Sequence, residues 1–290
     1  MGAPRLAKSG VKDRSQPPDF LAIGHITKDL LPEGRYQLGG TAAFSALAAQ
    51  RLGRQAALVT SARCDSAWEV ELGEVDISIL PAPATTTFRN LYSERGRCQW
   101  ILERARPIAG EAIPPAWLGA DIVLLGPVAG EIASDISMLF LPTSLIALSP
   151  QGLWRHWDEA GRVTTIPKPL APDWQVQVLI LSLEDVAEEP SVLASLIHRV
   201  PICVVTEGAK GATVYQAGTG RSFPPRRTSV CDPTGAGDVF AAAFLVRWRE
   251  TGDAEGAMAF GTCAASLSIE APGLAGIPSR WAIERALEGY

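Results

Sequence analysis

Segments that could cross or enter a membrane are missing from this sequence. Its longest apolar runs, such as residues 122–125 and 178–181, are far too short, because a helix that spans a bilayer needs about 20 apolar residues. Residues 1–18 carry scattered charges and no apolar core, so they do not form a signal peptide. We predict that residues 1–18 are a flexible N-terminal tail and that the protein has no membrane partner.

Cysteine and histidine are few and widely spaced. None of the five cysteines forms a C-x-x-C pair, and the three histidines have no metal-ligand spacing. A dispersed, odd number of cysteines in an acidic chain of this size is typical of reduced thiols in a cytoplasm. We therefore expect a cytoplasmic protein without a structural zinc site. The cysteines are Cys64, Cys98, Cys203, Cys231 and Cys263.

Positive charge is in the minority, with 26 Lys and Arg against 31 Asp and Glu and a formal net charge of −5. Nucleic acids and anionic membranes select strongly basic surfaces, so neither is expected as the main partner. The sequence also lacks G-x-x-x-x-G-K-[ST], which argues against a P-loop kinase. No G-x-G-x-x-G follows the first predicted strand, and neither H-E-x-x-H nor G-x-S-x-G occurs. These absences argue against a dinucleotide-binding dehydrogenase and against the zinc and serine hydrolases.

The hydrophobic pattern indicates the fold class. With 290 residues that are 47% hydrophobic, the chain can bury the core of one large α/β domain or two smaller ones. Short β-prone runs without polar alternation alternate with amphipathic stretches, and Gly53 lies where a helix cap is expected. This alternation predicts an α/β fold with a doubly wound, mainly parallel sheet and helices on both faces. The expected strands are residues 20–24, 57–60, 121–126, 145–149, 178–182 and 202–206, and the expected helices are residues 41–52, 131–140, 185–198 and 238–250.

One region, residues 76–106, interrupts this alternation. Two β-prone arms, residues 85–92 and 98–103, flank a polar turn at residues 93–97, which predicts a hairpin outside the main sheet. Together with residues 32–38, the hairpin is expected to form a small β lid. Because open α/β sheets bind ligands in the crevice at the carboxyl ends of their strands, we expect the lid to cover that crevice.

The most informative segment is residues 230–244. Gly235, Ala236 and Gly237 precede a carboxylate, Asp238, and an apolar stretch of helix formers. Small residues let backbone N–H groups approach a phosphate closely, and the start of a helix favours negative charge. Asp238 would lie in the first helical turn, where a base for phosphoryl transfer has to stand. The same residues also suit a glycine-rich loop with an ordinary capping Asp.

The segment D-P-T-G-A-G-D at residues 232–238, followed by V-F-A-A-A-F-L, resembles the C-terminal signature of the ribokinase family, also called the PfkB carbohydrate kinase family. The resemblance implies a ribokinase-like fold, an anion hole formed by Gly235, Ala236 and Gly237, and Asp238 as the catalytic base. It implies ATP and Mg²⁺ as cofactors. It also allows a homodimer that forms through the lid.

Two further segments resemble the family's substrate-binding motifs. Residues 24–29 read G-H-I-T-K-D, and the carboxylate of Asp29 could accept hydrogen bonds from two neighbouring hydroxyls, although a solvated loop Asp fits the spacing too. Gly39 and Gly40 open the second segment, in which Phe44 replaces the family's Asn. That replacement argues against ribose and fructose and favours an acceptor with an apolar face, such as an inositol, a nucleoside or a deoxygenated sugar acid. Phe44 could equally be an ordinary core residue. In the predicted lid, Arg89 and Asn90 are candidates for acceptor contact.

Nucleotide-binding residues are also implied by the resemblance. Ser182 and Asp185 occupy the ends of the family's N-x-x-E motif, where Asp185 would bind Mg²⁺ through water. A helix N-cap with an acidic first turn explains the same two residues. Thr206, Gly208 and Gly211 match the family's T-x-G-x-x-G loop, in a stretch that reads as a tight hairpin. Asp232 and Thr234 lie where some members bind a monovalent cation such as K⁺.

Matches at residues 24–29, 39–53, 85–99, 182–185, 206–211 and 232–244 predict a single ribokinase-like domain over residues 19–290, with lid segments at about 32–38 and 76–106. The function that this implies is ATP-dependent phosphorylation of a hydroxyl on a small polyhydroxylated substrate: a sugar, a sugar acid or an inositol. Two alternatives stay open. One is a nucleoside kinase of the same family, and the other is a catalytically silent ligand-binding or regulatory protein.

Overall fold

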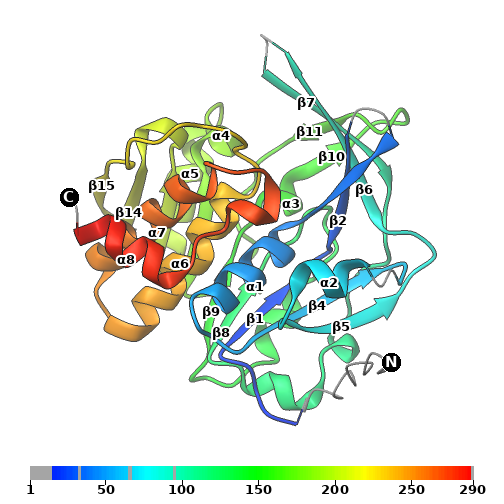
Figure 1. The fold of residues 1–290 in the computed structure, drawn as a ribbon, viewed down its shortest axis with the longest axis horizontal. Helices are drawn as coiled ribbons and strands as arrows, with labels where there is room; N and C mark the ends of the chain where they lie inside the picture. The colour runs from blue at the N-terminus through cyan, green and yellow to red at the C-terminus, as the bar shows by residue number, and fades with distance from the viewer. Residues whose placement is uncertain (1–14, 32–33, 65–66, 94–95, 289–290) are drawn as a thin grey trace, which may run out of the picture.

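A computed structural model describes residues 15–31, 34–64, 67–93 and 96–288 (Figure 1). The predicted tail, residues 1–18, lies mostly outside these ranges and stays a prediction, as does the lid segment at residues 32–33. Part of the predicted turn at residues 93–97 is likewise outside them, because residues 94–95 are not described. No helix within the described ranges is both long and apolar enough to cross a membrane.

The central sheet confirms the predicted fold class. Within the described residues it has nine strands in the order β15-β14-β13-β12-β9-β8-β1-β4-β5, and the strands from β13 to β5 are parallel. The two remaining strands, β14 and β15, extend one edge in antiparallel fashion. The bounds are β1 Phe20–Ile23, β4 Ala56–Ala62, β5 Asp76–Pro81, β8 Ile122–Leu125, β9 Leu145–Leu148, β12 Val178–Ser182, β13 Ile202–Thr206, β14 Ala212–Gln216 and β15 Thr219–Phe223.

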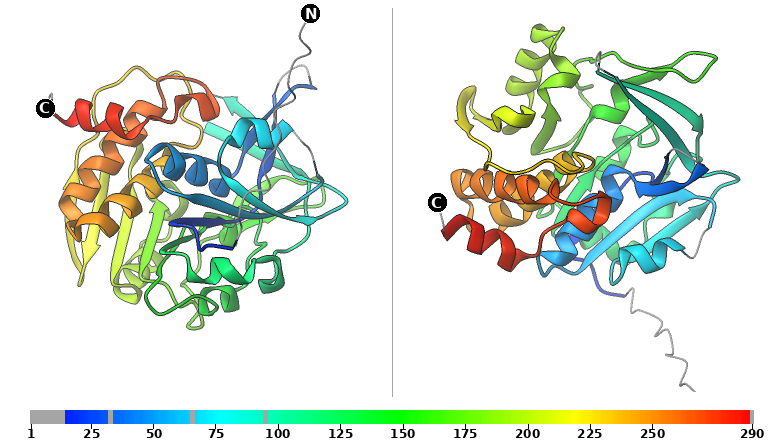
Figure 2. Two further views of the ribbon diagram at one scale, coloured as in Figure 1. Left: turned by 60° about the horizontal axis from the view of Figure 1, so that its bottom comes forward. Right: turned by 45° about the horizontal axis from the view of Figure 1, so that its top comes forward.

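Both faces of the sheet are buried, as the absence of polar alternation predicts. In β1, Phe20 and Ala22 contribute to one hydrophobic core, whereas Leu21 and Ile23 contribute to the other. The first core includes most of the apolar residues of α1, α6 and α7, and the second includes those of α5. Figure 2 shows helices and turns on both sides of the sheet.

The helices differ from the prediction in two places. Residues 131–140 form only a short 3₁₀ turn, η4 Ser134–Met138, because Ile132 is held in an extended bridge with Ile108. The predicted helix 185–198 is split at Pro190, which has no N–H to donate within a helix. The helices are α1 Thr41–Arg51, α2 Ala67–Leu72, α3 Gln151–Trp154, α4 Leu183–Val186, α5 Pro190–Arg199, α6 Ala236–Thr251, α7 Ala254–Ser268 and α8 Arg280–Glu288, with further 3₁₀ turns at Gly110–Ala112, Pro115–Gly119, Gly208–Lys210 and Gly273–Gly276.

A second, four-stranded sheet forms the lid, in the order β3-β2-β6-β7. Its strands are β2 Thr27–Leu30, β3 Tyr36–Gly39, β6 Thr86–Ser93 and β7 Gly96–Glu103. Two boundaries of the predicted lid are wrong. Residues 76–81 form β5 of the main sheet, because Ile77 and Ile79 pack against its core. Residues 27–30, which lie outside the predicted lid segments, form the lid strand β2.

A small hairpin supports the lid and lies next to β7 (Figure 1). Its strands are β10 Arg155–Trp157 and β11 Val163–Thr165. The amide of Ile101 in β7 donates a hydrogen bond to the carbonyl of Gly161 at 2.8 Å, and Trp100 forms a bridge with Arg162. The hairpin therefore links the lid to α3, the short helix that precedes it.

Candidate active site

A cavity of about 1010 Å³ lies between the lid, the starts of α1 and α6, and helix α7. It joins segments from almost the whole length of the chain. Thirteen of the predicted site residues line it, and they come from the lid, α1, β12, the β13–β14 turn and the start of α6. These residues are Asp29, Gly40, Phe44, Asn90, Ser182, Thr206, Gly208, Gly211, Thr234, Gly235, Ala236, Gly237 and Asp238.

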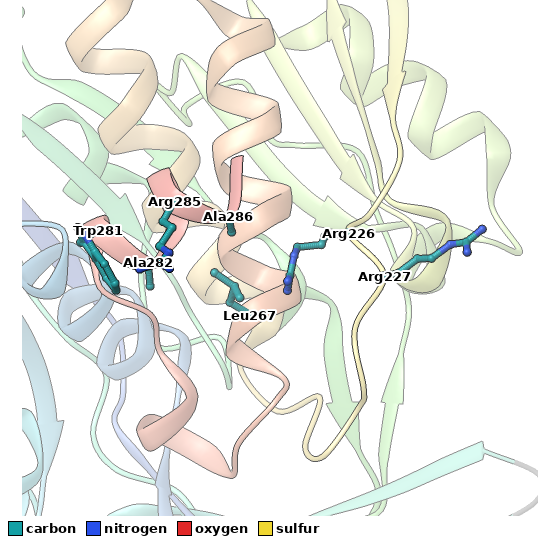
Figure 3. Close-up of a pocket in the computed structure, with 7 residues that line it drawn as sticks. All are labelled: Arg226, Arg227, Leu267, Trp281, Ala282, Arg285 and Ala286. Carbon is teal, nitrogen blue, oxygen red and sulfur yellow. The ribbon is translucent and has the colours of Figure 1, made fainter. Parts of the chain in front are cut away.

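A second hollow of about 650 Å³ lies on the other side of the loop at residues 225–228 (Figure 3). Arg226 and Arg227 border both spaces. Figure 3 shows Arg227 pointing away from Trp281 and Arg285, so the three arginines of this hollow do not converge. Its lining residues include no carboxylate and no amide side chain. The larger cavity is therefore the candidate active site.

The start of α6 forms one wall of that cavity. Gly235 has a φ of 77°, and a Cβ at this position would lie 2.1 Å from Cδ1 of Phe44, so only glycine fits. The amide of Ala236 donates to the carbonyl of Pro233 at 3.3 Å. Among the backbone hydrogen bonds of the described residues, the amides of Gly235 and Gly237 have no acceptor. These two N–H groups, at the positive end of a 16-residue helix, are suited to bind an anion.

Asp238 lies in the first turn of α6 and lines the same wall. Burial raises the pKa of its carboxyl to about 6, against a hydrogen bond with Thr41 and the positive charge of Arg155, which lower it. The negative charge of Asp29 raises it further. The carboxylate is thus poised to accept a proton near neutral pH, which is the property required of a general base.

Asp29 reaches the cavity from the lid strand β2 rather than from the end of β1. Thr27 donates a hydrogen bond to its Oδ1 at 3.2 Å, which orients the carboxylate. Gly39 lies behind this pair and does not line the cavity; a Cβ there would stand 2.8 Å from Oδ2 of Asp29. Gly40 has a φ of 98°, and its Cβ would lie 2.4 Å from the carbonyl oxygen of His25. Both glycines therefore make room for Asp29 and the turn into α1.

Phe44 is 1% exposed, and its ring packs against Gly235. It touches the cavity wall but offers little surface to an acceptor. The structure therefore favours the core interpretation of Phe44 over that of an apolar face for a ligand.

Lid strand β6 presents alternate side chains to the cavity. Phe88 and Asn90 line it, and Nε2 of Gln99 in β7 donates to Oδ1 of Asn90 at 2.9 Å. Arg89 lies between them in the strand and is not a lining residue, because successive side chains of a strand point to opposite faces. Its guanidinium instead lies 5.2 Å from the ring centre of Trp100. The expectation that Arg89 contacts the acceptor is corrected on this geometry.

The acidic turn after β12 has a different arrangement from the predicted one. Ser182 caps α4 by accepting a hydrogen bond from the amide of Glu184 at 3.3 Å, as the capping alternative predicts. Glu184, which the sequence analysis did not single out, lines the cavity, whereas Asp185 does not. Nε2 of Gln151 donates to Oδ1 of Asp185 at 2.9 Å. Burial raises the pKa of Asp185, although the bond from Gln151 and the charge of Arg155 lower it.

The far end of the cavity is formed by the β13–β14 turn and by α7. Thr206, Gly208 and Gly211 form part of its wall, and the predicted tight hairpin there is confirmed by the antiparallel pairing of β13 and β14. The cavity wall also includes a mixed apolar and hydroxyl surface that no sequence pattern predicted, because its residues lie in a loop and a helix with no motif. These residues are Pro225, Thr228, Val230, Thr262, Ala265, Ser266 and Ile269.

Asp232 and Thr234, the candidates for a monovalent cation, are held by backbone amides. The carboxylate of Asp232 accepts hydrogen bonds from the amides of Thr234 and Gly273, each at 2.9 Å. Burial alone would raise the pKa of Asp232, but a hydrogen bond with the Thr234 side chain and the two amide hydrogen bonds together lower it. Thr234 lines the cavity and Asp232 does not. In the part of the chain that the structure describes, no three His, Cys, Asp or Glu residues gather into a metal-binding group.

Comparison with known proteins places these features in a family. A profile described as "pfkB family carbohydrate kinase" matches residues 177–280. The chain is similar to the cytidine kinase of Thermococcus kodakarensis, with 29% identity over 251 residues that cover 78% of this chain and 87% of that protein.

Two solved structures share the fold. One is a pyrophosphate-dependent kinase in the ribokinase family, solved with a pyrophosphate analogue and myo-inositol: its TM-score is 0.75 and its identity 20%, and the match covers 92% of this chain and 99% of that one. The other is Arabidopsis thaliana ribokinase with ribose and ATP: its TM-score is 0.73 and its identity 19%, over 94% of this chain and 99% of that one.

Proposed function

Because this chain belongs to the PfkB carbohydrate kinase family, also called the ribokinase family, and is a phosphotransferase of that family, we propose that it transfers the terminal phosphoryl group of ATP to a hydroxyl of a small polyhydroxylated acceptor. One observation carries the proposal. Asp238, with its pKa raised by burial to about 6, lies beside the amides of Gly235 and Gly237 on the wall of a single cavity.

The chemistry follows from these residues. The acceptor hydroxyl loses its proton to the carboxylate of Asp238, and its oxygen forms a bond to the terminal phosphorus of the donor. The bond from that phosphorus to the bridging oxygen breaks, and the leaving diphosphate keeps the electron pair. The N–H groups of Gly235 and Gly237 stabilise the negative charge on the phosphoryl oxygens. Asp29 holds the acceptor by hydrogen bonds to neighbouring hydroxyls.

The choice of ATP over pyrophosphate rests on the far end of the cavity. Pyrophosphate needs only the anion hole and positive charge, whereas a nucleotide also needs a surface for its base. Val230, Ala265 and Ile269 provide apolar area there, and Thr262 and Ser266 provide hydroxyl groups. Such a surface, with few polar groups on an apolar wall, is typical of small-molecule binding.

The residues also suit a bound Mg²⁺. Mg²⁺ in phosphoryl-transfer sites keeps several waters and takes one or two carboxylates plus donor phosphates. Glu184 lines the cavity, so its carboxylate is the one that would hold the ion, whereas Asp185 is hydrogen-bonded to Gln151 and does not line the cavity. When bound, Mg²⁺ neutralises charge on the donor phosphates. A protein-only metal cage is not required for that role.

A nucleoside acceptor is the second candidate. It is favoured by the similarity to a cytidine kinase over 87% of that protein's length. The paired amides of Asn90 and Gln99 on the lid suit it as well, because amides can bind the edge of a base. A nucleoside also carries the ribose diol that Asp29 would bind, so the two candidates share the catalytic chemistry and differ in the acceptor.

The test is a transfer assay with purified protein, Mg²⁺ and either ATP or pyrophosphate as donor. A panel of sugars, sugar acids, inositols and nucleosides serves as acceptors, and release of ADP or orthophosphate is measured. We expect ADP release with at least one acceptor and none from Asp238→Asn. A wild-type protein that binds ATP but transfers to no acceptor in the panel would favour the silent ligand-binding alternative instead. Transfer from pyrophosphate alone would overturn the donor assignment.

A further inference from the structure

Arg155, the first residue of β10, lines the cavity, although no motif in the sequence marks it. Hydrogen bonds hold its guanidinium in place: Nη1 donates to the carbonyl of Val128 at 2.9 Å, and Nη2 donates to Oε1 of Gln151 at 2.6 Å. Because the guanidinium is planar and rigid, these bonds fix the direction in which it can meet an anion.

The position of Arg155 relates it to both sides of the reaction. Its charge lowers the pKa of Asp238, at the start of α6. Gln151 bonds both Arg155 and Asp185, so the guanidinium is tied to the donor-side turn as well. Arg155 therefore lines the same cavity as Asp238 and is connected through Gln151 to the turn after β12.

The lid holds Arg155 from the other side. The guanidinium lies 5.3 Å from the ring centre of Phe88 in lid strand β6. The hairpin that begins at Arg155 is bonded to lid strand β7 through Ile101 and Gly161. Arg155 thus contacts both the lid and the main domain, and the orientation of its guanidinium depends on both.

The other two arginines on the cavity wall occupy a different place. Arg226 and Arg227 belong to the loop that faces α7 at the nucleotide-base end, and Arg226 forms an ion pair with Glu270 at 3.2 Å. Near Asp238, the anion hole offers only N–H dipoles. A phosphoryl group in transfer carries charge on three oxygens, and arginine binds such oxygens with two parallel hydrogen bonds.

We infer that Arg155 contacts the transferred phosphoryl group and is a further catalytic residue of the proposed kinase reaction. The inference rests on the proposed function. In the transfer described above, the guanidinium donates hydrogen bonds to oxygens of the phosphoryl group while the bond to the acceptor oxygen forms and the bond to the leaving diphosphate breaks. It exchanges no proton and forms no covalent bond.

The first test measures binding without any acceptor. The Kd values of Mg²⁺–ADP and of Mg²⁺ with the β,γ-imido analogue of ATP are compared by calorimetry for the wild type and Arg155→Gln. A contact to the terminal phosphoryl group predicts that Arg155→Gln binds the imido analogue about 10- to 100-fold more weakly, with little change for ADP, because a hydrogen bond between two charged groups is lost. Arg155→Lys should keep part of the affinity.

Arg104→Gln is the matched control. Arg104 also donates to a backbone carbonyl, that of Gly130 at 3.1 Å, and its guanidinium lies 5.5 Å from the ring centre of Trp157, but it is exposed and does not line the cavity. The Arg104→Gln variant should therefore leave both Kd values unchanged. Equal binding of both nucleotides by wild type and Arg155→Gln would overturn the inference, and so would an equal loss of both, since that indicates a purely structural role.

The second test uses the acceptor with the highest activity in the panel. Arg155→Gln should lower kcat about 10²- to 10³-fold, as is typical for a lost group that stabilises transition-state charge, while the KM for the acceptor changes little. The acid limb of kcat/KM should move to higher pH, because a positive charge that lowers the pKa of Asp238 has been removed. A defect confined to acceptors with a carboxylate or phosphate would assign Arg155 to the acceptor and overturn the inference. A wild type that binds neither nucleotide would contradict the proposed function itself.

Discussion

The two ends of the cavity are constructed in different ways. The proposed anion hole and base come from one short segment, Gly235 to Asp238, and the anion hole would act through backbone amides. The proposed acceptor end is formed by side chains from separate strands, among them Asp29, Asn90 and Gln99. Backbone amides at a helix start can bind any phosphate, whereas side chains on a lid can change without disturbing them. If the proposed roles hold, separate parts of the chain determine the transfer chemistry and the choice of acceptor.

The strongest test of this separation is Asp238→Asn. Loss of the base should lower kcat by about 10²- to 10⁴-fold and leave the Kd of Mg²⁺–ATP nearly unchanged, because the amides of the anion hole are kept. Steady-state kinetics and calorimetry check the two parts. Near-normal turnover would remove Asp238 from the mechanism.

The next test compares two glycines of the anion hole. Gly235→Ala should destabilise the protein by about 2–4 kcal/mol and abolish most activity, because the residue has a φ of 77° and its Cβ would meet the ring of Phe44. The control is Gly237→Ala, whose Cβ would meet no atom within 4 Å and which should keep the free energy of unfolding. Urea unfolding measures both. Equal stability of the two variants would refute the packing argument.

A smaller effect, confined to the acceptor, is expected from Asp29→Asn. Hydrogen bonds to a charged group are worth about 1.5–3 kcal/mol, so KM for the acceptor should rise about 10- to 100-fold while KM for ATP stays within about twofold. Initial-rate measurements with each substrate varied in turn decide the matter. If KM for ATP rose by the same factor, the two ends of the cavity would not be independent.

The smallest effect concerns pH. Since burial raises the pKa of Asp238 to about 6, kcat/KM should fall about fivefold from pH 6 to pH 5 as the base becomes protonated. The effect of pH on stability has the opposite sign. Because the pKa of Asp238 is higher in the folded state than its unfolded value of about 3.9, the protonated carboxyl favours the folded state. This contribution to the free energy of unfolding is complete below about pH 3.9 and is lost as the pH rises through about 6.

The pH dependence of stability has a direct check. Asp238→Asn should unfold at a higher temperature than the wild type at pH 7.5, and the difference should vanish near pH 4. Thermal melts across that range measure it. A constant difference at all pH values would show that the carboxyl is not the group that titrates.

The sequence was informative where the chemistry is local. The buried strands and the start of α6 were predicted correctly, because each depends on a contiguous pattern of burial or small residues. Arg89 was placed on the wrong face of its strand, since a hairpin's register decides which side chains face inward. Residues 131–140 have helical spacing, but the bridge between Ile132 and Ile108 is a tertiary contact that no local pattern contains.

Other parts of the candidate site could not be found in advance because they are assembled from distant segments. Gln151 and Arg155 belong to a short helix and a hairpin with no motif, and they reach the cavity only because that hairpin docks on the lid. Glu184 differs from the expected Asp185 by one position in a turn, where the orientation of the cap decides which carboxylate faces the cavity. Such details depend on packing rather than on spacing.

The contact between the ring of Phe44 and Gly235 has a consequence for evolution and for engineering. Position 44 belongs to α1, yet its side chain packs against the turn that forms the proposed anion hole. A change of acceptor preference introduced at this position would loosen the turn beneath the phosphates. Descendants of this chain that acquire a polar residue at 44 should therefore carry a compensating bulky side chain from a neighbouring helix.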